Sequence, residues 1–208
     1  MTTTDPNLQR IIAAVGPVRQ LVLFGSRAAD VARSGSDWDV LVVHEVRVRP
    51  PRRNVDVVSL RPEQLSSDLW LGSELAGHVA HYGIWLVGEP DWTTSVTRSN
   101  RAIRRKATRI VRRATNLQRQ WKLLDRPYRL DFARALRRDI QRCLSLIQGD
   151  PVAPTKVIDE RWRLDSLDLV IPTLRRLTGA TSGVQAFLSE IVASTPAKTA
   201  HGVSTWGT

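Results

Sequence analysis

The hydrophobic pattern of this chain changes its period near residue 98, and this change constrains the fold more than any other feature of the sequence. Before residue 98, short apolar runs are separated by segments with glycine or proline, a pattern typical of strands and short helices. After it, apolar residues recur at spacings of three and four, as on amphipathic helices. The sequence therefore predicts an α+β fold, in which a small mixed-sheet head over 1–92 is followed by an all-α helical bundle over 98–194 and a flexible tail over 195–208.

The first 92 residues contain apolar runs of strand length between helical and turn-forming segments. The run WDVLVV at 38–43 is apolar at almost every position, which favours a central strand covered on both faces. The predicted strands cover 18–24, 38–43, 55–60 and 84–87, and the predicted helices cover 7–15, 26–33 and 62–82.

The region after residue 98 is predicted to form a series of helices. The apolar stripe of the first helix consists of Ile103, Ala107, Ile110, Ala114, Leu117, Trp121 and Leu124. A second helix over 129–148 is expected to end at Gly149 and to bury Phe132, Leu136, Ile140, Leu144 and Ile147. Further helices are predicted over 154–163, 166–178 and 183–193.

Two aspartates at the start of the second predicted strand form the most informative pattern for function. The first strand leads into Gly25 and Ser26, and Asp37 and Asp39 follow after a spacer. Because side chains alternate along a strand, residues i and i+2 project from one face. Two carboxylates held that close repel each other unless a cation lies between them. A hard divalent cation with oxygen ligands, Mg²⁺ or Mn²⁺, is the expected occupant.

A third carboxylate, Asp56, opens the next strand. If this strand pairs with 38–43, Asp56 completes a site for two metal ions about 4 Å apart, a spacing suited to nucleotidyl transfer. Gly25 lets the backbone approach a phosphate, and Ser26 with the following amides can donate hydrogen bonds to phosphate oxygens. Arg27 is a candidate cation for the same triphosphate. The candidate nucleotide-binding residues are therefore Gly25, Ser26 and Arg27, and the candidate catalytic and metal-binding residues are Asp37, Asp39 and Asp56.

These residues resemble a known family. The segment GSRAADVARSGSDWDVLV resembles the glycine-serine, spacer, Asp-x-Asp signature of the minimal nucleotidyltransferases in the DNA polymerase β superfamily, which include toxin–antitoxin-type members. Asp56 stands where that family keeps its third carboxylate, and the segment 74–90 resembles the helix and closing strand that usually follow. Trp38 is bulkier than the aliphatic residue of the family pattern, and it is predicted to face away from the acids into the core.

The resemblance, which covers residues 8–90, implies a reaction. An acceptor hydroxyl attacks the α-phosphate of a nucleoside triphosphate (NTP), and pyrophosphate leaves. Asp37 and Asp39 would bridge two ions, Mg²⁺ or Mn²⁺, that hold the triphosphate. Asp56 would hold the second ion and help to remove the proton of the acceptor.

The charge distribution bears on the identity of the acceptor. The net charge is +11, and residues 98–142 contain sixteen Lys and Arg against three Asp and Glu, a balance of +13. Concentrated positive charge favours a polyanionic partner, so the predicted acceptor is RNA, such as the end of a tRNA. An enzyme that modifies RNA in this way could act as a toxin. The alternative is a solvated face or a protein contact. The candidate nucleic-acid contacts are Arg98, Arg101, Arg105, Arg109 and Arg112.

Other functions compete with this prediction. The main alternative is an antitoxin-type adenylyltransferase that modifies a paired HEPN-type toxin on a Tyr hydroxyl, because a basic surface suits an acidic partner. A small polycation such as an aminoglycoside needs an acidic pocket, and a non-catalytic nucleic-acid-binding protein would not need three carboxylates. A helical RNase with an Arg-x₄₋₆-His arrangement on a helix is excluded, because no histidine lies within 98–193; the four are His44, His78, His81 and His201. His78 and His81 are interpreted as packing or surface residues rather than a metal pair.

Composition predicts a cytoplasmic protein without a membrane partner. No run approaches the ~18 apolar residues of a membrane span, and the N-terminus lacks the pattern of a secretory signal. The single cysteine, Cys143, excludes an intramolecular disulfide and fits a reducing compartment. The sequence leaves open the oligomeric state and the base of the NTP.

Overall fold

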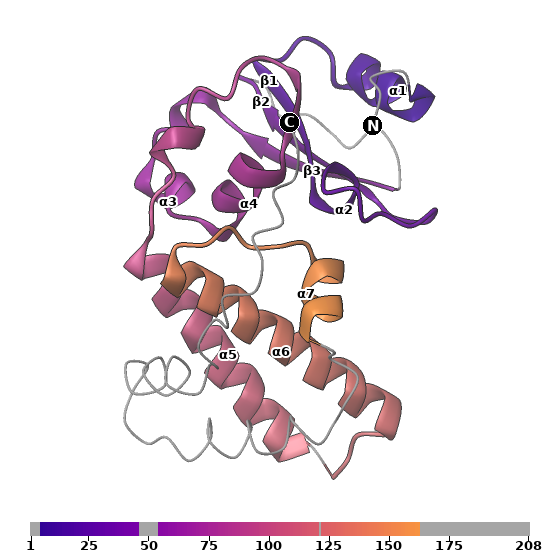
Figure 1. Ribbon diagram of the computed structural model, residues 1–208, viewed down its shortest axis with the longest axis vertical. Coiled ribbons are helices and arrows are strands. Elements are labelled where there is room, and N and C mark those ends of the chain that lie inside the picture. Colours follow the sequence, from indigo (N-terminus) through magenta and orange to yellow (C-terminus); the bar gives the residue numbers. More distant parts are fainter. Residues whose placement is uncertain (1–4, 46–53, 121, 163–208) are drawn as a thin grey trace.

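The computed structural model describes residues 5–45, 54–120 and 122–162, and it places a mixed sheet with short helices above two long helices that lie side by side (Figure 1). The predicted α+β class is confirmed. In chain order, the elements are α1 (Pro6–Val15), β1 (Gln20–Phe24), α2 (Gly25–Ala28), β2 (Trp38–Val43), β3 (Val55–Leu60), the 3-10 helix η1 (Pro62–Gln64), α3 (Asp68–Leu71), α4 (Glu74–Tyr82), β4 (Ile84–Val87), the 3-10 helix η2 (Thr93–Ser95), α5 (Asn100–Gln120), α6 (Arg126–Gln148) and α7 (Thr155–Trp162).

The sheet has the order β3-β2-β1-β4, with β1 antiparallel to both β2 and β4, and β2 parallel to β3. The four predicted strands are therefore present, and β2 lies inside the sheet as its apolar sequence predicted. Because side chains alternate, each strand contributes to two cores. The core under α1 contains Leu8, Ile11, Leu21, Leu23, Trp38, Val40 and Val42, and the core under α4 contains Val22, Phe24, Leu41, Val43, Ala76, Val79 and Trp92.

The single helix predicted over 62–82 is wrong, because the segment forms η1, α3 and α4. Two serines start new helices: Ser67 Oγ accepts a hydrogen bond from the Trp70 amide, and Ser73 Oγ accepts one from the Ala76 amide. Such N-caps stabilise a helix start and interrupt a longer helix. The turn at Gly72 also lies against the beginning of α5, since a Cβ atom there would be 2.3 Å from Ser99 Cβ.

The helical half consists of α5, α6 and α7. The stripe predicted on α5 is buried from Ile103 to Leu117, whereas Trp121 lies outside the described residues. The prediction that Phe132 is buried is wrong, because its side chain is 46% exposed and Ala133, one residue later, occupies the inward position. The buried residues of α6 are Ala133, Leu136, Asp139, Ile140, Cys143 and Leu144.

The remaining predictions for this half are tested only in part. Helix α7 confirms the helix predicted over 154–163, while those over 166–178 and 183–193 and the tail over 195–208 lie outside the described residues. Within the described ranges, no helix has both the length and the apolar character needed to cross a membrane.

Candidate active site

The turn after β1 brings Gly25 against the side chain of Asp39. Gly25 has a φ of 74°, in the left-handed region that favours glycine. A Cβ atom at this position would lie 2.1 Å from Asp39 Oδ2, so glycine is the residue that leaves room for the carboxylate. From the sequence, this glycine was predicted to let the backbone approach a phosphate. The structure adds a second reason, which is its contact with Asp39.

Asp37, Asp39 and Asp56 come together at the beginning of two parallel strands. Asp39 in β2 is in register with Asp56 in β3, which confirms that the two strands are neighbours, and Asp37 lies two residues before Asp39. Burial, together with the negative charges of Asp56 and Asp37, raises the pKa of Asp39 to about 6. The side chains of Asp37 and Asp56 are exposed. The site thus holds an excess of negative charge that a cation would relieve.

The chemistry of these three side chains suits a hard divalent cation. They offer only carboxylate oxygens, which are typical ligands of Mg²⁺ and Mn²⁺. In the part of the chain that the structure describes, no group of three or more His, Cys, Asp or Glu side chains is arranged to hold a metal ion. The donor set nevertheless fits such an ion, and its identity and number stay predictions.

Arg27 stabilises the loop that leads into β2. Its Nε donates to the Asp37 carbonyl at 3.2 Å, and its Nη2 donates to the Ser36 carbonyl at 2.6 Å. Its guanidinium also lies 4.2 Å from the ring centroid of Trp38, which is buried in the core as predicted. These contacts hold the guanidinium against the loop that carries Asp37, and its role toward a triphosphate stays a prediction. Arg33, which the sequence analysis did not single out, lines the neighbouring cleft.

A cleft of about 730 Å³ lies between the head and the helical half, and we call it the active-site cleft. On the head side it is lined by the Gly25–Ser26 turn, Asp37, Asp39 and Arg33. On the helical side it is lined by Arg142 of α6, the segment 152–156, and Asp159 and Glu160 of α7. This volume lies within the range of about 300–1,000 Å³ that is usual for small-molecule sites. Asp37 and Asp39 therefore border a cavity that can contain a nucleotide.

Comparison with known proteins identifies the family. The nucleotidyltransferase domain family matches residues 7–148, which is more than half of the chain. The chain belongs to this nucleotidyltransferase family. It is accordingly an enzyme that transfers a nucleotidyl group from an NTP. No curated protein sequence matches the chain.

Two solved structures resemble this nucleotidyltransferase distantly. One is a crystal structure of a toxin-antitoxin with AMP-PNP, which has 19% sequence identity and a TM-score of 0.29, over 43% of this chain and 77% of that chain. The other is spectinomycin adenyltransferase AAD(9) from Enterococcus faecialis with ATP and spectinomycin, which has 11% identity and a TM-score of 0.45, over 88% of this chain and 94% of that chain.

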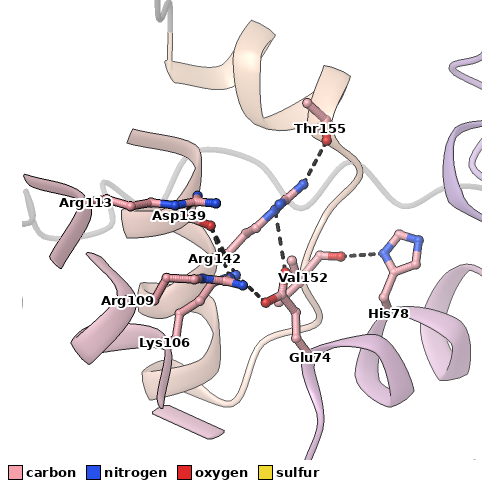
Figure 2. Close-up of polar contacts among 9 residues, drawn as sticks. All are labelled: Glu74, His78, Lys106, Arg109, Arg113, Asp139, Arg142, Val152 and Thr155. Carbon is pink, nitrogen blue, oxygen red and sulfur yellow. Dashed lines mark hydrogen bonds and ion pairs between the residues drawn. The ribbon is translucent and has the colours of Figure 1, made fainter. Parts of the chain in front are cut away.

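Polar contacts join helix α4 of the nucleotidyltransferase head to the helical half (Figure 2). Lys106 of α5 is 5% exposed, and its Nζ lies 2.5 Å from Glu74 Oε2 and 3.3 Å from Asp139 Oδ1. Glu74 Oε1 also lies 3.6 Å from Arg142 Nε. Arg109 and Arg113 pair with Asp139, so several cations of the basic segment neutralise acids within the molecule.

A second cavity, of about 540 Å³, runs beside α5 on the other side of Glu74, and we call it the basic groove. It is bordered by the turn at Gly72–Ser73 and by three of the predicted nucleic-acid contacts, Arg101, Arg105 and Arg109. Arg101 and Arg105 are exposed, and neither forms an ion pair with the described residues, whereas Arg109 Nη2 lies 3.4 Å from Asp139 Oδ1. The other two predicted contacts, Arg98 and Arg112, are exposed outside this groove.

His78 connects the two parts of the nucleotidyltransferase. The sequence interpretation of His78 as a packing residue is consistent with its burial, but it missed this bridge. One ring nitrogen lies 2.7 Å from the Val152 carbonyl, and the other lies 3.2 Å from the Gly25 amide. Neither this bridge nor the cleft residues Arg142 and Lys156 have a local sequence signal, because their approach depends on how α6 and α7 pack on the head.

Proposed function

We propose that this enzyme transfers a nucleoside monophosphate from an NTP to a hydroxyl group of RNA, with Asp37, Asp39 and Asp56 as ligands of divalent cations. The observation that carries the proposal is the pairing of Asp39 with Asp56 beside Gly25, at the edge of the active-site cleft. The raised pKa of Asp39 supports a cation at this position, because bound positive charge would stabilise its ionised form.

The carboxylates and the Gly25–Ser26 turn have different roles in the proposed reaction. The acceptor oxygen forms a bond to the α-phosphorus, the bond from that phosphorus to the bridging oxygen breaks, and pyrophosphate leaves. Asp56, which is exposed at the start of β3, accepts the proton of the acceptor hydroxyl. A bound divalent cation would supply positive charge to the triphosphate and favour loss of that proton.

The triphosphate is proposed to lie along the Gly25–Ser26 turn. The Ser26 hydroxyl and the amides that open α2 can donate to phosphate oxygens, whereas the Gly25 amide already donates to His78. Arg33 at the cleft is a better-placed cation for the phosphates than Arg27, whose guanidinium holds the loop before β2. Lys156 lines the opposite wall of the cleft, where its Nζ lies 3.8 Å from Glu160 Oε1.

The basic groove supports RNA as the acceptor. The groove and the active-site cleft both border Glu74, so an RNA whose phosphates contact Arg101 and Arg105 would lie beside the cleft. The exposed cations that form no ion pair with a described residue include Arg98, just before α5, and Arg101, Arg104, Arg105 and Arg112 on α5.

A small polycationic acceptor fits the cleft less well. Such a substrate requires acidic side chains that are free to pair with it. On the helical wall, Asp159 is already bound by Arg138 in two hydrogen bonds, and Glu160 lies 3.8 Å from Lys156. Glu74 is paired with Lys106 and Arg142. The acids of this wall are therefore largely neutralised within the protein.

The test is a labelling experiment. The enzyme is incubated with Mg²⁺ and each α-labelled NTP in turn, with total tRNA or with the product of a neighbouring open reading frame. We expect label on RNA with the wild-type enzyme. We expect no label when the Asp37→Asn or the Asp56→Asn variant replaces the wild-type enzyme. Label on the partner protein alone would favour the antitoxin-type alternative. Full transfer by the Asp56→Asn variant would contradict the assignment of the carboxylates.

A further inference from the structure

His78 lies on the same face of α4 as Glu74, four residues earlier, and its side chain is nine-tenths buried. Glu74 binds α5 and α6 through Lys106 and Arg142, and His78 binds the segment after α6 through the Val152 carbonyl (Figure 2). One helix face thus carries the contacts of the head with three parts of the helical half. His78 is the member of this pair that also contacts the Gly25–Ser26 turn.

The two hydrogen bonds of His78 require one protonation state. The Val152 carbonyl can only accept, so Nδ1 carries the hydrogen of the 2.7 Å contact. The Gly25 amide can only donate, so Nε2 accepts in the 3.2 Å contact and carries no hydrogen. The ring is therefore a neutral imidazole in its Nδ1–H form. Burial lowers the pKa of His78, which agrees with a neutral ring.

The hydrogen bond to the Gly25 amide acts on the peptide that sets the position of the Gly25–Ser26 turn beside Asp39. The Phe24–Gly25 peptide leads into the left-handed residue that lies against Asp39. A shift of this peptide would move the Ser26 turn relative to the Asp39 carboxylate. His78 holds the peptide from the amide side, while the ring of Phe24 meets the imidazole edge to face at 6.2 Å.

We propose that His78 is a positioning residue, which couples docking of the segment after α6 to the geometry of the Gly25–Ser26 turn. The inference rests on the proposed function, because that turn is the proposed site of the triphosphate. The segment has its own anchor, since Arg142 Nη2 donates to Thr155 Oγ1 at 2.8 Å. The segment after α6 is thus held independently of His78. Through its contacts with Val152 and Gly25, His78 makes the position of the turn depend on the position of that segment.

Two substitutions separate the two hydrogen bonds. In His78→Asn, the amide group overlaps the position of Nδ1, so it can donate to Val152 but cannot reach Gly25. In His78→Gln, the longer side chain brings a carbonyl oxygen to the position of Nε2, where it can accept from the Gly25 amide. The matched control is His81→Gln, on the exposed side of the same helix.

We expect His78→Asn to lower kcat/KM for the NTP by about 10–100-fold, the usual effect of losing an outer contact of a site. His78→Gln should recover part of that loss but not all of it, because it restores the bond to Gly25 without the bond to Val152. Full recovery in His78→Gln would show that the Val152 contact plays no part, and His81→Gln should match the wild type. Thermal unfolding checks that each variant is folded. Equal activity of His78→Asn and wild type would overturn the proposal, as would a Gln variant no more active than the Asn variant.

Two further measurements do not depend on the acceptor. Nitrogen-15 NMR of the imidazole in the wild-type enzyme should show the Nδ1–H form at neutral pH, and an Nε2–H form would overturn the proposal even if no variant folds. Calorimetry with Mg²⁺ and a non-hydrolysable ATP analogue should show weaker binding to His78→Asn than to His78→Gln. If nucleotide binding differs between the two variants as expected but the wild-type enzyme labels no RNA, the proposed acceptor is wrong while the role of His78 stands.

Discussion

Asp39 bears its negative charge in an unfavourable position in the absence of a cation. Its pKa is raised from 3.8 to about 6, mainly by burial and then by the charges of Asp56 and Asp37. A carboxyl group with a raised folded-state pKa stabilises the fold when it is protonated, and this contribution is lost as the pH rises through about 6. At neutral pH the ionised group therefore opposes folding, and the proposed cation would offset that effect.

The first prediction follows from this charge. Asp39→Asn should stabilise the metal-free protein at pH 7.5 by about 2 kcal/mol once solvent screening is allowed for, or about 5 °C in Tm. The gain should shrink as the pH falls from about 6 toward 3.8, because wild-type Asp39 then becomes protonated. Thermal unfolding in EDTA across this pH range measures it. Asp131→Asn, at a largely exposed site, is the control and should show no such trend. An Asp39→Asn variant that is less stable than wild type at pH 7.5 would contradict the argument.

The second prediction concerns Gly25 and uses Gly149 as its matched control. Both residues have nearly the same positive φ, 74° and 73°, but a Cβ atom would meet Asp39 at Gly25 and nothing within 4 Å at Gly149. Each substitution by Ala should cost about 1–2 kcal/mol from backbone strain. Gly25→Ala should in addition lower nucleotidyl transfer by about 100-fold, because the carboxylate must move. Urea unfolding and initial rates distinguish the two effects, and equal rates for both variants would show that the Asp39 contact is unimportant.

At the scale of the elements, the third prediction concerns the buried lysine between α4, α5 and α6. Lys106→Met should destabilise the protein by about 2–4 kcal/mol, because Glu74 and Asp139 lose a cation at a position almost without solvent. Arg113→Gln should cost less than about 1 kcal/mol, because Arg113 is half exposed and Asp139 keeps its other partners. Chemical denaturation provides both values. If the two variants are equally stable, the joint between the head and helical half does not depend on Lys106.

The elements also show which parts of the fold the sequence could predict. The four strands were predictable because each is a short, largely apolar run bounded by polar or turn-forming residues, and the α5 stripe was predictable because its period is local. The division of 62–82 was missed, since it depends on two serine caps and on the contact of Gly72 with Ser99, which is distant in the chain. Phe132 was misplaced because periodicity indicates a helix face but not how far along the partner helix the contact extends.

The head side of the active-site cleft could be predicted from the sequence, whereas the helical side could not. Asp37 and Asp39 are two residues apart, so strand geometry alone places them together, and the pairing with Asp56 required only that two successive strands be neighbours. The opposite wall of the cleft comes from α6, α7 and the segment between them, more than a hundred residues later in the chain. Nothing in the local pattern of Arg142, Lys156 or Glu160 indicates that they face the carboxylates. Their position is a property of the packed molecule.

On the scale of the whole molecule, some cations of the basic segment form ion pairs between helices, and others are exposed at the basic groove. Lys106 is buried between Glu74 and Asp139, and Arg109 and Arg113 also pair with Asp139, so part of the +13 segment stabilises the packing of helices. Arg101 and Arg105 remain at the basic groove beside the cleft. The net charge of the segment therefore overstates the charge available to a polyanion, and the groove is the part on which the proposed RNA acceptor would depend.

The fourth prediction tests that dependence with the double variant Arg101→Gln/Arg105→Gln. If each arginine contacts one phosphate, the slope of log K against log salt for single-stranded RNA should become shallower by about 1.4, and binding should weaken similarly for all sequences. The KM for RNA should rise while kcat is retained, because neither arginine borders the carboxylates. Salt titrations by fluorescence anisotropy and initial rates measure both effects. The charge-matched control is Arg10→Gln/Arg19→Gln, which removes two exposed cations of α1 and the start of β1 from the head. Equal loss in the two double variants would mean that RNA responds to net charge alone, and the groove would then have no specific part in acceptor binding.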